Sequence, residues 1–73
     1  MSEITFIVSP GEESGMLVAA WRAPGGGGIT TQGVSMDKLR GNIREAVACH
    51  FEEGEAPARI RLHFAGDVLL QPA

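Results

Sequence analysis

The residues of this chain best suited to chemistry are Cys49, His50 and His63. Cys49 and His50 are neighbours on a predicted helix, where successive side chains point about 100° apart, so the two cannot easily share one metal ion. His63 falls on a predicted strand, on the face opposite Ile60 and Leu62. We therefore expect structural roles for both histidines, with no metal site and no cofactor.

Other catalytic groups are equally hard to assemble. No serine or cysteine stands in a recognisable nucleophile context. The nine carboxylates fall in predicted turns and on the solvent side of the predicted helix, whereas an acid–base pair needs one carboxylate in an apolar setting. The sequence therefore predicts a protein that is not an enzyme. The enzymatic alternative is a small hydrolase or nuclease that uses carboxylates with His50 or His63.

Four consecutive glycines invite comparison with a phosphate-binding loop: Gly25, Gly26, Gly27 and Gly28. The run lacks the Gly-Lys-Ser/Thr ending, and no helix is predicted directly after it to present backbone amides to a phosphate. We interpret the run as a flexible connection between two strands, because glycine has the largest backbone entropy.

Four short runs of apolar and β-branched residues predict the strands: 4–8, 16–22, 29–32 and 59–64. The first two most simply pair as a hairpin, and residues 67–70 could add a last short strand. With one helix before the fourth run, the order is β-β-β-α-β. We predict an α+β domain with a mainly antiparallel sheet of three to five strands and one helix on one face.

The helix is predicted over about residues 36–53. Ser35 is a good N-cap, and Gly54 and Pro57 are expected to end the helix. Its apolar stripe recurs at helical spacing: Met36, Leu39, Ile43, Val47 and Phe51. Gly41 lies inside the helix at a cost of roughly 1 kcal/mol against alanine. Either another backbone approaches it closely or the glycine is simply tolerated.

The size of the chain favours self-association. Its 73 residues, with 44% hydrophobic residues and a net charge of −3, suit one folded domain over residues 1–73. A monomer of this size buries roughly 60% of the surface that its unfolded chain exposes. Small chains commonly compensate with disulfides, a metal or self-association. Because Cys49 is the only cysteine, we expect a homodimer or a larger even-numbered oligomer.

The first two predicted strands are apolar on both faces. Val18 can face the helix, which leaves Leu17, Ala19 or Trp21 to face elsewhere. Uncovered apolar surface usually marks an interface. We therefore expect Leu17, Ala19 and Trp21 at a partner or oligomer interface, with Trp21 as an anchor. The alternative, equally open, is that Trp21 fills the core of the monomer.

A positive row follows the fourth predicted strand, formed by Arg59, Arg61 and His63. These residues could bind an acidic partner, or they could protect a sheet edge from unwanted pairing. The sequence favours neither interpretation. Arg59 and Arg61 therefore join the candidate interface residues.

The sequence also predicts where the protein acts, which we expect to be the cytoplasm. Met1 leads straight into a strand-like run rather than a signal peptide. No apolar run approaches the ~20 residues that span a bilayer. The single unpaired thiol suits the cytoplasm. The mildly acidic balance argues against nonspecific nucleic-acid binding, which usually needs a basic face.

Residues 29–47 resemble the core sequence of HicB-like antitoxins, in which a strand containing Thr-Gln-Gly precedes a short amphipathic helix. The matching residues, in order, are Thr31, Gln32, Gly33, Ser35, Leu39, Asn42, Ile43, Glu45 and Ala46. The opening strand, acidic turn and second strand are also similar to that family. The resemblance implies a β-β-β-α-β fold of the kind described as partial RNase H-like.

The resemblance also implies a function. HicB-like proteins bind and neutralise small HicA-like toxins that cleave mRNA, and here the sheet face or a sheet edge would cover the toxin's basic RNA-binding surface. Many members carry a C-terminal DNA-binding domain that this sequence lacks, so no direct DNA binding is expected. Residues 23–28 also depart from the family pattern. The alternative is an orphan homo-oligomeric binding module with no toxin partner.

Overall fold

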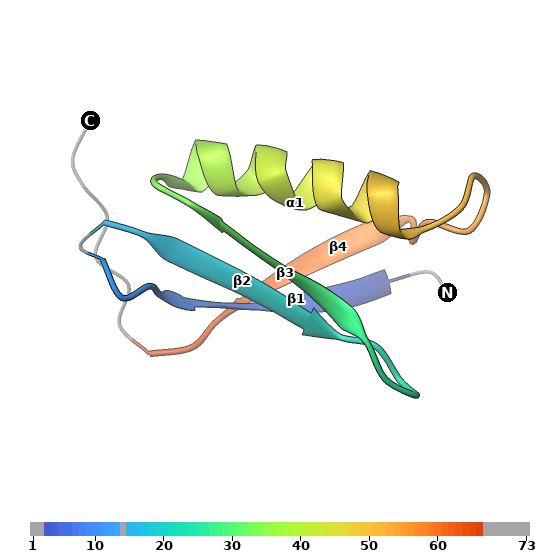
Figure 1. The fold of residues 1–73 in the computed structure, drawn as a ribbon, viewed down its shortest axis with the longest axis horizontal. Coiled ribbons are helices and arrows are strands. Elements are labelled where there is room, and N and C mark those ends of the chain that lie inside the picture. Colours follow the sequence, from blue (N-terminus) through green and yellow to red (C-terminus); the bar gives the residue numbers. More distant parts are fainter. Residues whose placement is uncertain (1–2, 14, 67–73) are drawn as a thin grey trace.

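The computed structural model describes residues 3–13 and 15–66. Within them lie four strands and one helix: β1 (Glu3–Pro10), β2 (Leu17–Arg22), β3 (Gly28–Gly33), α1 (Met36–His50) and β4 (Arg59–Phe64). The helix covers one face of the sheet (Figure 1). We call this the inner face, and the uncovered one the outer face. The predicted α+β architecture is confirmed, whereas the possible strand at 67–70 lies outside the described residues.

The sheet is mixed rather than antiparallel. Its order is β3-β2-β1-β4, with antiparallel pairing of β1 with β2 and of β2 with β3. The pairing of β4 with β1 is parallel, in the register Glu3↔Arg59 to Val8↔Phe64. Two of the three strand pairings are thus antiparallel, in line with the predicted mainly antiparallel sheet, and the β1–β4 pair is the exception. The two hairpins make β3 parallel to β1, and α1 then returns the chain so that β4 runs in that same direction.

The helix begins where predicted and ends earlier. The Ser35 Oγ accepts a hydrogen bond from the Lys38 backbone N–H at 3.2 Å, which is the expected N-cap. The helix ends at His50, and Phe51 is extended at φ −99° and ψ 146°. The predicted end at residue 53 is wrong because Phe51 leaves the helical stripe and packs on Trp21, with 5.6 Å between ring centroids.

The core lies between α1 and the inner face. The strands alternate buried and exposed positions, as their pleat requires. The buried apolar residues are Ile4, Phe6, Val8, Leu17, Ala19, Trp21, Ile29, Leu39, Ile43 and Val47. Within residues 3–13 and 15–66, no helix combines the length and apolar character that a membrane crossing requires.

Candidate partner-binding site

The junction between β3 and α1 brings a strand and the helix into close contact. A side chain at Gly33 would place its Cβ 2.6 Å from the Leu39 backbone nitrogen, so only glycine allows the strand and the helix to approach this closely. The Asn42 Nδ2 donates a hydrogen bond to the Gln32 carbonyl oxygen at 2.6 Å. Together with the Ser35 cap, these contacts hold the start of α1 against the end of β3.

The same junction accounts for most of the residues that resemble HicB-like antitoxins. Leu39 and Ile43 are buried beneath α1, while Gly33, Ser35 and Asn42 shape or close the junction. These residues therefore position the helix rather than form a binding surface. A partner would have to be recognised by other residues, on the outer face, on the sheet edges or in the loops.

Three of the expected interface residues lie in the core of the subunit. Leu17, Ala19 and Trp21 face α1 and are 2%, 0% and 8% exposed, so the orientation predicted for this strand is wrong. Val18 points to the outer face instead. Both faces of β2 are apolar, so the alternation alone cannot show which of its side chains face the helix. The two largest side chains, Leu17 and Trp21, take the inner face, where α1 can cover them.

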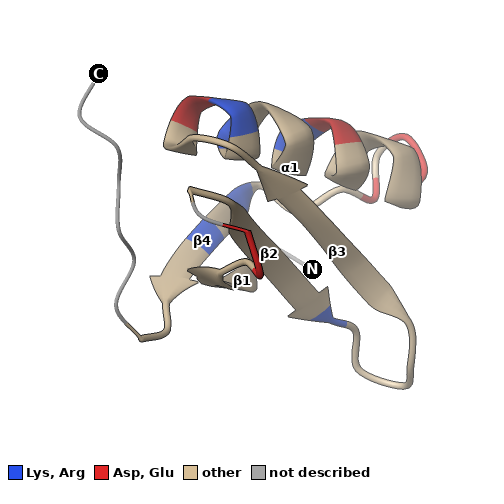
Figure 2. Ribbon diagram, turned by 60° about the vertical axis from the view of Figure 1, so that its left-hand side comes forward, with Lys and Arg blue, Asp and Glu red and all other residues tan. Residues whose placement is uncertain are grey.

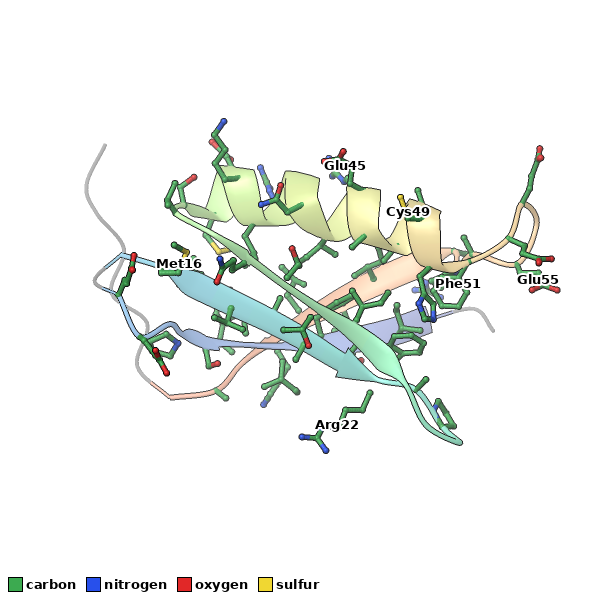
Figure 3. All side chains as sticks on the ribbon, viewed as in Figure 1. Met16, Arg22, Glu45, Cys49, Phe51 and Glu55 are labelled. Atoms are coloured by element: carbon green, nitrogen blue, oxygen red, sulfur yellow. The ribbon has the colours of Figure 1, made fainter. Side chains whose placement is uncertain are left out.

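Trp21 anchors an aromatic cluster at the end of α1. Its ring centroid lies 5.6 Å from those of Phe51 and His50, and the His50 ring meets it edge-on. Phe51 lies where the chain leaves the helix (Figure 3). This cluster joins β2 to the C-terminal end of α1, and it gives Trp21 the core role that the sequence left as an alternative.

The outer face carries the positive charge of the sheet. Arg59, Arg61 and His63 are exposed and alternate along β4 with the inner-face residues, as predicted. The Arg61 Nε donates to the Glu3 carboxylate at 3.2 Å. Arg22 on β2 also points away from the sheet, on the side opposite α1 (Figure 3). In the described chain, Glu3 is the one carboxylate in an ion pair with these arginines.

Acidic residues lie on α1, at Asp37 and Glu45, and in two loops of the chain (Figure 2). Glu12 and Glu13 lie in the β1–β2 turn, and residues 52–55 contribute Glu52, Glu53 and Glu55 to the loop between α1 and β4. The Met16 backbone N–H donates a hydrogen bond to the Glu13 carbonyl, so Met16 marks the position of this turn. Figure 3 shows Met16 at the end of the molecule opposite Glu55. The toxin was expected to meet the sheet face or a sheet edge, but the outer face, including β4, carries positive charge, which is the wrong sign for contact with a basic surface.

The glycine run closes the hairpin between β2 and β3. All four glycines have positive φ, from 74° to 152°. The Ala23 N–H donates to the Gly27 carbonyl and the Gly26 N–H to the Ala23 carbonyl, each at 3.1 Å. A strand follows the run rather than a helix. The run is therefore a strand connection, as the sequence indicated, and its geometry differs from that of a phosphate loop.

The metal-ligating residue types lie apart in the part of the chain that the structure describes. No three His, Cys, Asp or Glu side chains there gather around a point that could hold a metal ion. His50 packs on Trp21 at the inner face, while His63 is exposed on the outer face. Cys49 is exposed and free. The sheet thus separates the two histidines.

A groove that the sequence did not reveal runs between α1 and β4. Its volume is about 240 Å³, and it is lined by Arg40, Ile43 and Arg44 of α1 and by Ile60 and Leu62 of β4. In the described chain, α1 approaches β3 and β2 within 8 Å between Cα atoms, but neither β1 nor β4. The inner side of β4 stays only half-buried. The sequence predicted which residues face the helix, but not that the helix would lean toward β3.

Comparisons with known proteins place the chain in a family. No family model matches it, and no solved structure matches it. A UPF0150 protein of Thermotoga maritima is 37% identical over 68 residues, which span 93% of this chain and 90% of that protein. A UPF0150 protein of Archaeoglobus fulgidus is 50% identical over 32 residues, 44% of this chain and 48% of that protein. With the first match running through nearly the whole of both chains, this protein belongs to the UPF0150 family.

Proposed function

We propose that this chain is a HicB-like antitoxin, or a protein derived from one, that binds and neutralises a small HicA-like toxin that cleaves mRNA. The main support is the β3–α1 junction. The residues that resemble the HicB-like core, among them Gly33, Leu39 and Asn42, act together at one place in the fold. The element order β-β-β-α-β is also the one that the resemblance implies.

The charge distribution indicates which surface would meet the toxin. A basic RNA-binding surface is best complemented by the acidic loop between α1 and β4, which carries Glu52, Glu53 and Glu55. This loop directly follows the C-terminal end of α1, where the helix dipole adds negative potential. The contact would occlude the toxin without any chemistry by the antitoxin. Cys49, exposed and unpaired, is consistent with a cytoplasmic setting for such a complex.

The test is co-expression with a small basic ribonuclease encoded beside this gene, followed by purification and an mRNA-cleavage assay. We expect a stable complex in which cleavage is lost. The double variant Glu52→Lys/Glu53→Lys should weaken the complex at least tenfold. The matched control, Glu12→Lys/Glu13→Lys, reverses the same two charges at the other end of the molecule and should bind normally. The proposal fails if no small basic protein is encoded nearby and none co-purifies from the native host.

One observation favours the second candidate, a homo-oligomeric binding module with no toxin partner. Ile7 is 43% exposed at the centre of the outer face, opposite Ala20 of β2 and His63 of β4. Val18 is half-buried on the same face. An apolar strip of this kind suits contact between two copies. Light scattering at micromolar concentration tests this, with a dimer or a larger even-numbered oligomer expected. A monomer mass near the chain mass of 7.7 kDa would refute it.

A further inference from the structure

We propose that the β4 edge, meaning the side of β4 that does not face β1, binds an extended segment of a partner protein whose side chains alternate between carboxylates and apolar groups. The segment would add a strand to the sheet. This site goes beyond the proposed toxin contact, because it lies on a different surface and selects a partner of opposite charge.

The first support is an available row of backbone hydrogen-bonding groups. In the sheet order β3-β2-β1-β4, β4 is a terminal strand, and within the described residues it pairs with β1 alone. Among residues 3–13 and 15–66, nothing pairs with the groups on its other side, which a further strand could therefore bind. The other terminal strand, β3, carries no charged residue, and the Asn42 side chain already binds its Gln32 carbonyl. Of the two edges, β4 is the one with side chains that could select a partner.

The outer side of β4 selects for acid. Residues directly opposite each other in neighbouring strands share a face and lie close enough for opposite charges to attract. Arg59 and Arg61 would therefore stand opposite carboxylates on the outer face of an added strand. Glu3 of β1 already attracts an arginine of β4, although diagonally: its carboxylate accepts a hydrogen bond from Arg61 at 3.2 Å, whereas the residue directly opposite Glu3 is Arg59. Arg59 makes no ion pair within the described residues.

The inner side of β4 selects for apolar groups. Ile60 and Leu62 are half-buried and form one wall of the groove beneath α1. Phe64, next along the same side, is 47% exposed. An added strand would point every second side chain toward this groove. Covering the half-buried wall removes apolar surface from water, which contributes roughly 25 cal/mol for each Å² buried.

The helix supplies two further cations at the rim of the groove. The Arg40 guanidinium is held by Asp37 at 2.9 Å, while Arg44 makes no ion pair within the described residues. The ligand's outer side would therefore face Arg59 and Arg61, and its inner side would pack on Ile43, Ile60 and Leu62, with Arg40 and Arg44 at the rim adding attraction for an acidic segment as a whole. A polypeptide strand with period-two alternation fits that arrangement, whereas a strand of uniform charge does not.

A second copy of the same strand fits poorly. When two β4 strands pair with their apolar sides together, every outer-face pair joins residues from the set Arg59, Arg61 and His63. Arginines placed directly opposite each other repel, and charged residues on an edge strand commonly serve to block such pairing. The edge-protection and partner-binding interpretations of the positive row are therefore compatible. The row would repel another copy and attract an acidic strand.

The probe for the test is a labelled peptide, Glu-Val-Glu-Leu-Glu-Val, with blocked ends, whose binding to the full chain is followed by fluorescence anisotropy. Two matched peptides accompany it. Glu-Glu-Glu-Val-Leu-Val keeps the composition without the alternation, and Lys-Val-Lys-Leu-Lys-Val keeps the alternation with reversed charge. We expect the alternating acidic peptide to bind at least tenfold more tightly than either. Hydrogen exchange should slow at the amides of β4 and stay unchanged at β3.

The variants locate the site. Arg59→Glu/Arg61→Glu should reduce the affinity for the acidic peptide at least tenfold. Arg22→Glu/Lys38→Glu makes the same change in net charge at exposed positions outside β4 and should bind within twofold of the original chain. Circular dichroism confirms that both variants fold. If a variant fails to fold, the comparison of the three peptides on the unaltered protein still tests the proposal.

Four outcomes would overturn the proposal. Equal affinity for the alternating acidic peptide and for Glu-Glu-Glu-Val-Leu-Val would show that binding is only general charge attraction. Slowed exchange at β3 would place the added strand on the wrong edge. A dimer joined through β4 in the absence of peptide would make the second copy the occupant. Binding that appears only after removal of residues 67–73 would make the chain's own end the occupant.

Discussion

The β3 edge of the sheet is closed beneath α1, whereas the β4 edge stands clear of the helix. At β3, Gly33 lets the Leu39 backbone approach, and Asn42 binds the Gln32 carbonyl. At β4, Ile60 and Leu62 stay only half-buried, and a groove remains between the strand and α1. One helix of this size cannot cover four strands equally. Holding it at one edge leaves the other edge exposed for binding.

The comparison also separates two kinds of residue. At the closed edge the important residues, Gly33 and Asn42, are small or polar, and they act through close contacts that hold the backbone of α1 in place. At the open edge they are long and charged, and they alternate with apolar side chains. Substitutions at the closed edge should therefore change the free energy of unfolding, while substitutions at the open edge should change binding.

The largest expected effect is a loss of folding caused by a substitution in the core between α1 and the sheet. Trp21→Arg should unfold the chain at every protein concentration, because it places a charge where the side chain is 8% exposed and removes the contact with Phe51. Loss of a buried tryptophan alone typically costs about 3–5 kcal/mol. Circular dichroism across a range of concentrations measures this. A folded monomer would instead indicate that Trp21 serves an interface between copies.

Gly33→Ala should have the next largest effect, by breaking the closed edge. The added methyl group would lie 2.6 Å from the Leu39 backbone nitrogen, and overpacking of this kind typically costs about 1–3 kcal/mol. Urea unfolding gives the change in the free energy of unfolding. Gly54→Ala is not a suitable control, since Gly54 has a φ of +85°. Gly41→Ala serves instead, and an equal loss of stability in both would contradict the special role of Gly33.

Gly41→Ala should by itself stabilise the protein by about 1 kcal/mol, because alanine is the better helix former. A methyl group there meets nothing within 4 Å in the described structure. Among the residues that the structure describes, no backbone therefore approaches Gly41 closely. Thermal unfolding measures the gain. If the variant is more stable but loses binding to a co-purified partner, then Gly41 marks a surface where that partner's backbone approaches.

The sequence predicted the elements better than their arrangement. The Ser35 cap, the buried stripe of Leu39, Ile43 and Val47, and the bounds of β4 follow from local rules and were confirmed. The parallel partner of β4 was missed because pairing between distant strands depends on the path of the whole chain. The inner and outer faces of β2 were assigned the wrong way round because Val18 and Ala19 suit either face. The groove was missed for a similar reason, since it depends on the tilt of α1, which the junction at Gly33 determines.

The smallest expected effect on stability belongs to the open edge. Arg61→Gln removes an ion pair with Glu3 in which the Arg61 side chain is 65% exposed. Such exposed pairs contribute about 0–1 kcal/mol, so urea unfolding should detect a change of less than about 0.5 kcal/mol. The affinity for the alternating acidic peptide should nevertheless fall severalfold, because Arg61 would lose its carboxylate contact. A loss of stability comparable to that of Gly33→Ala would show that both edges are structural, and the difference between them would disappear.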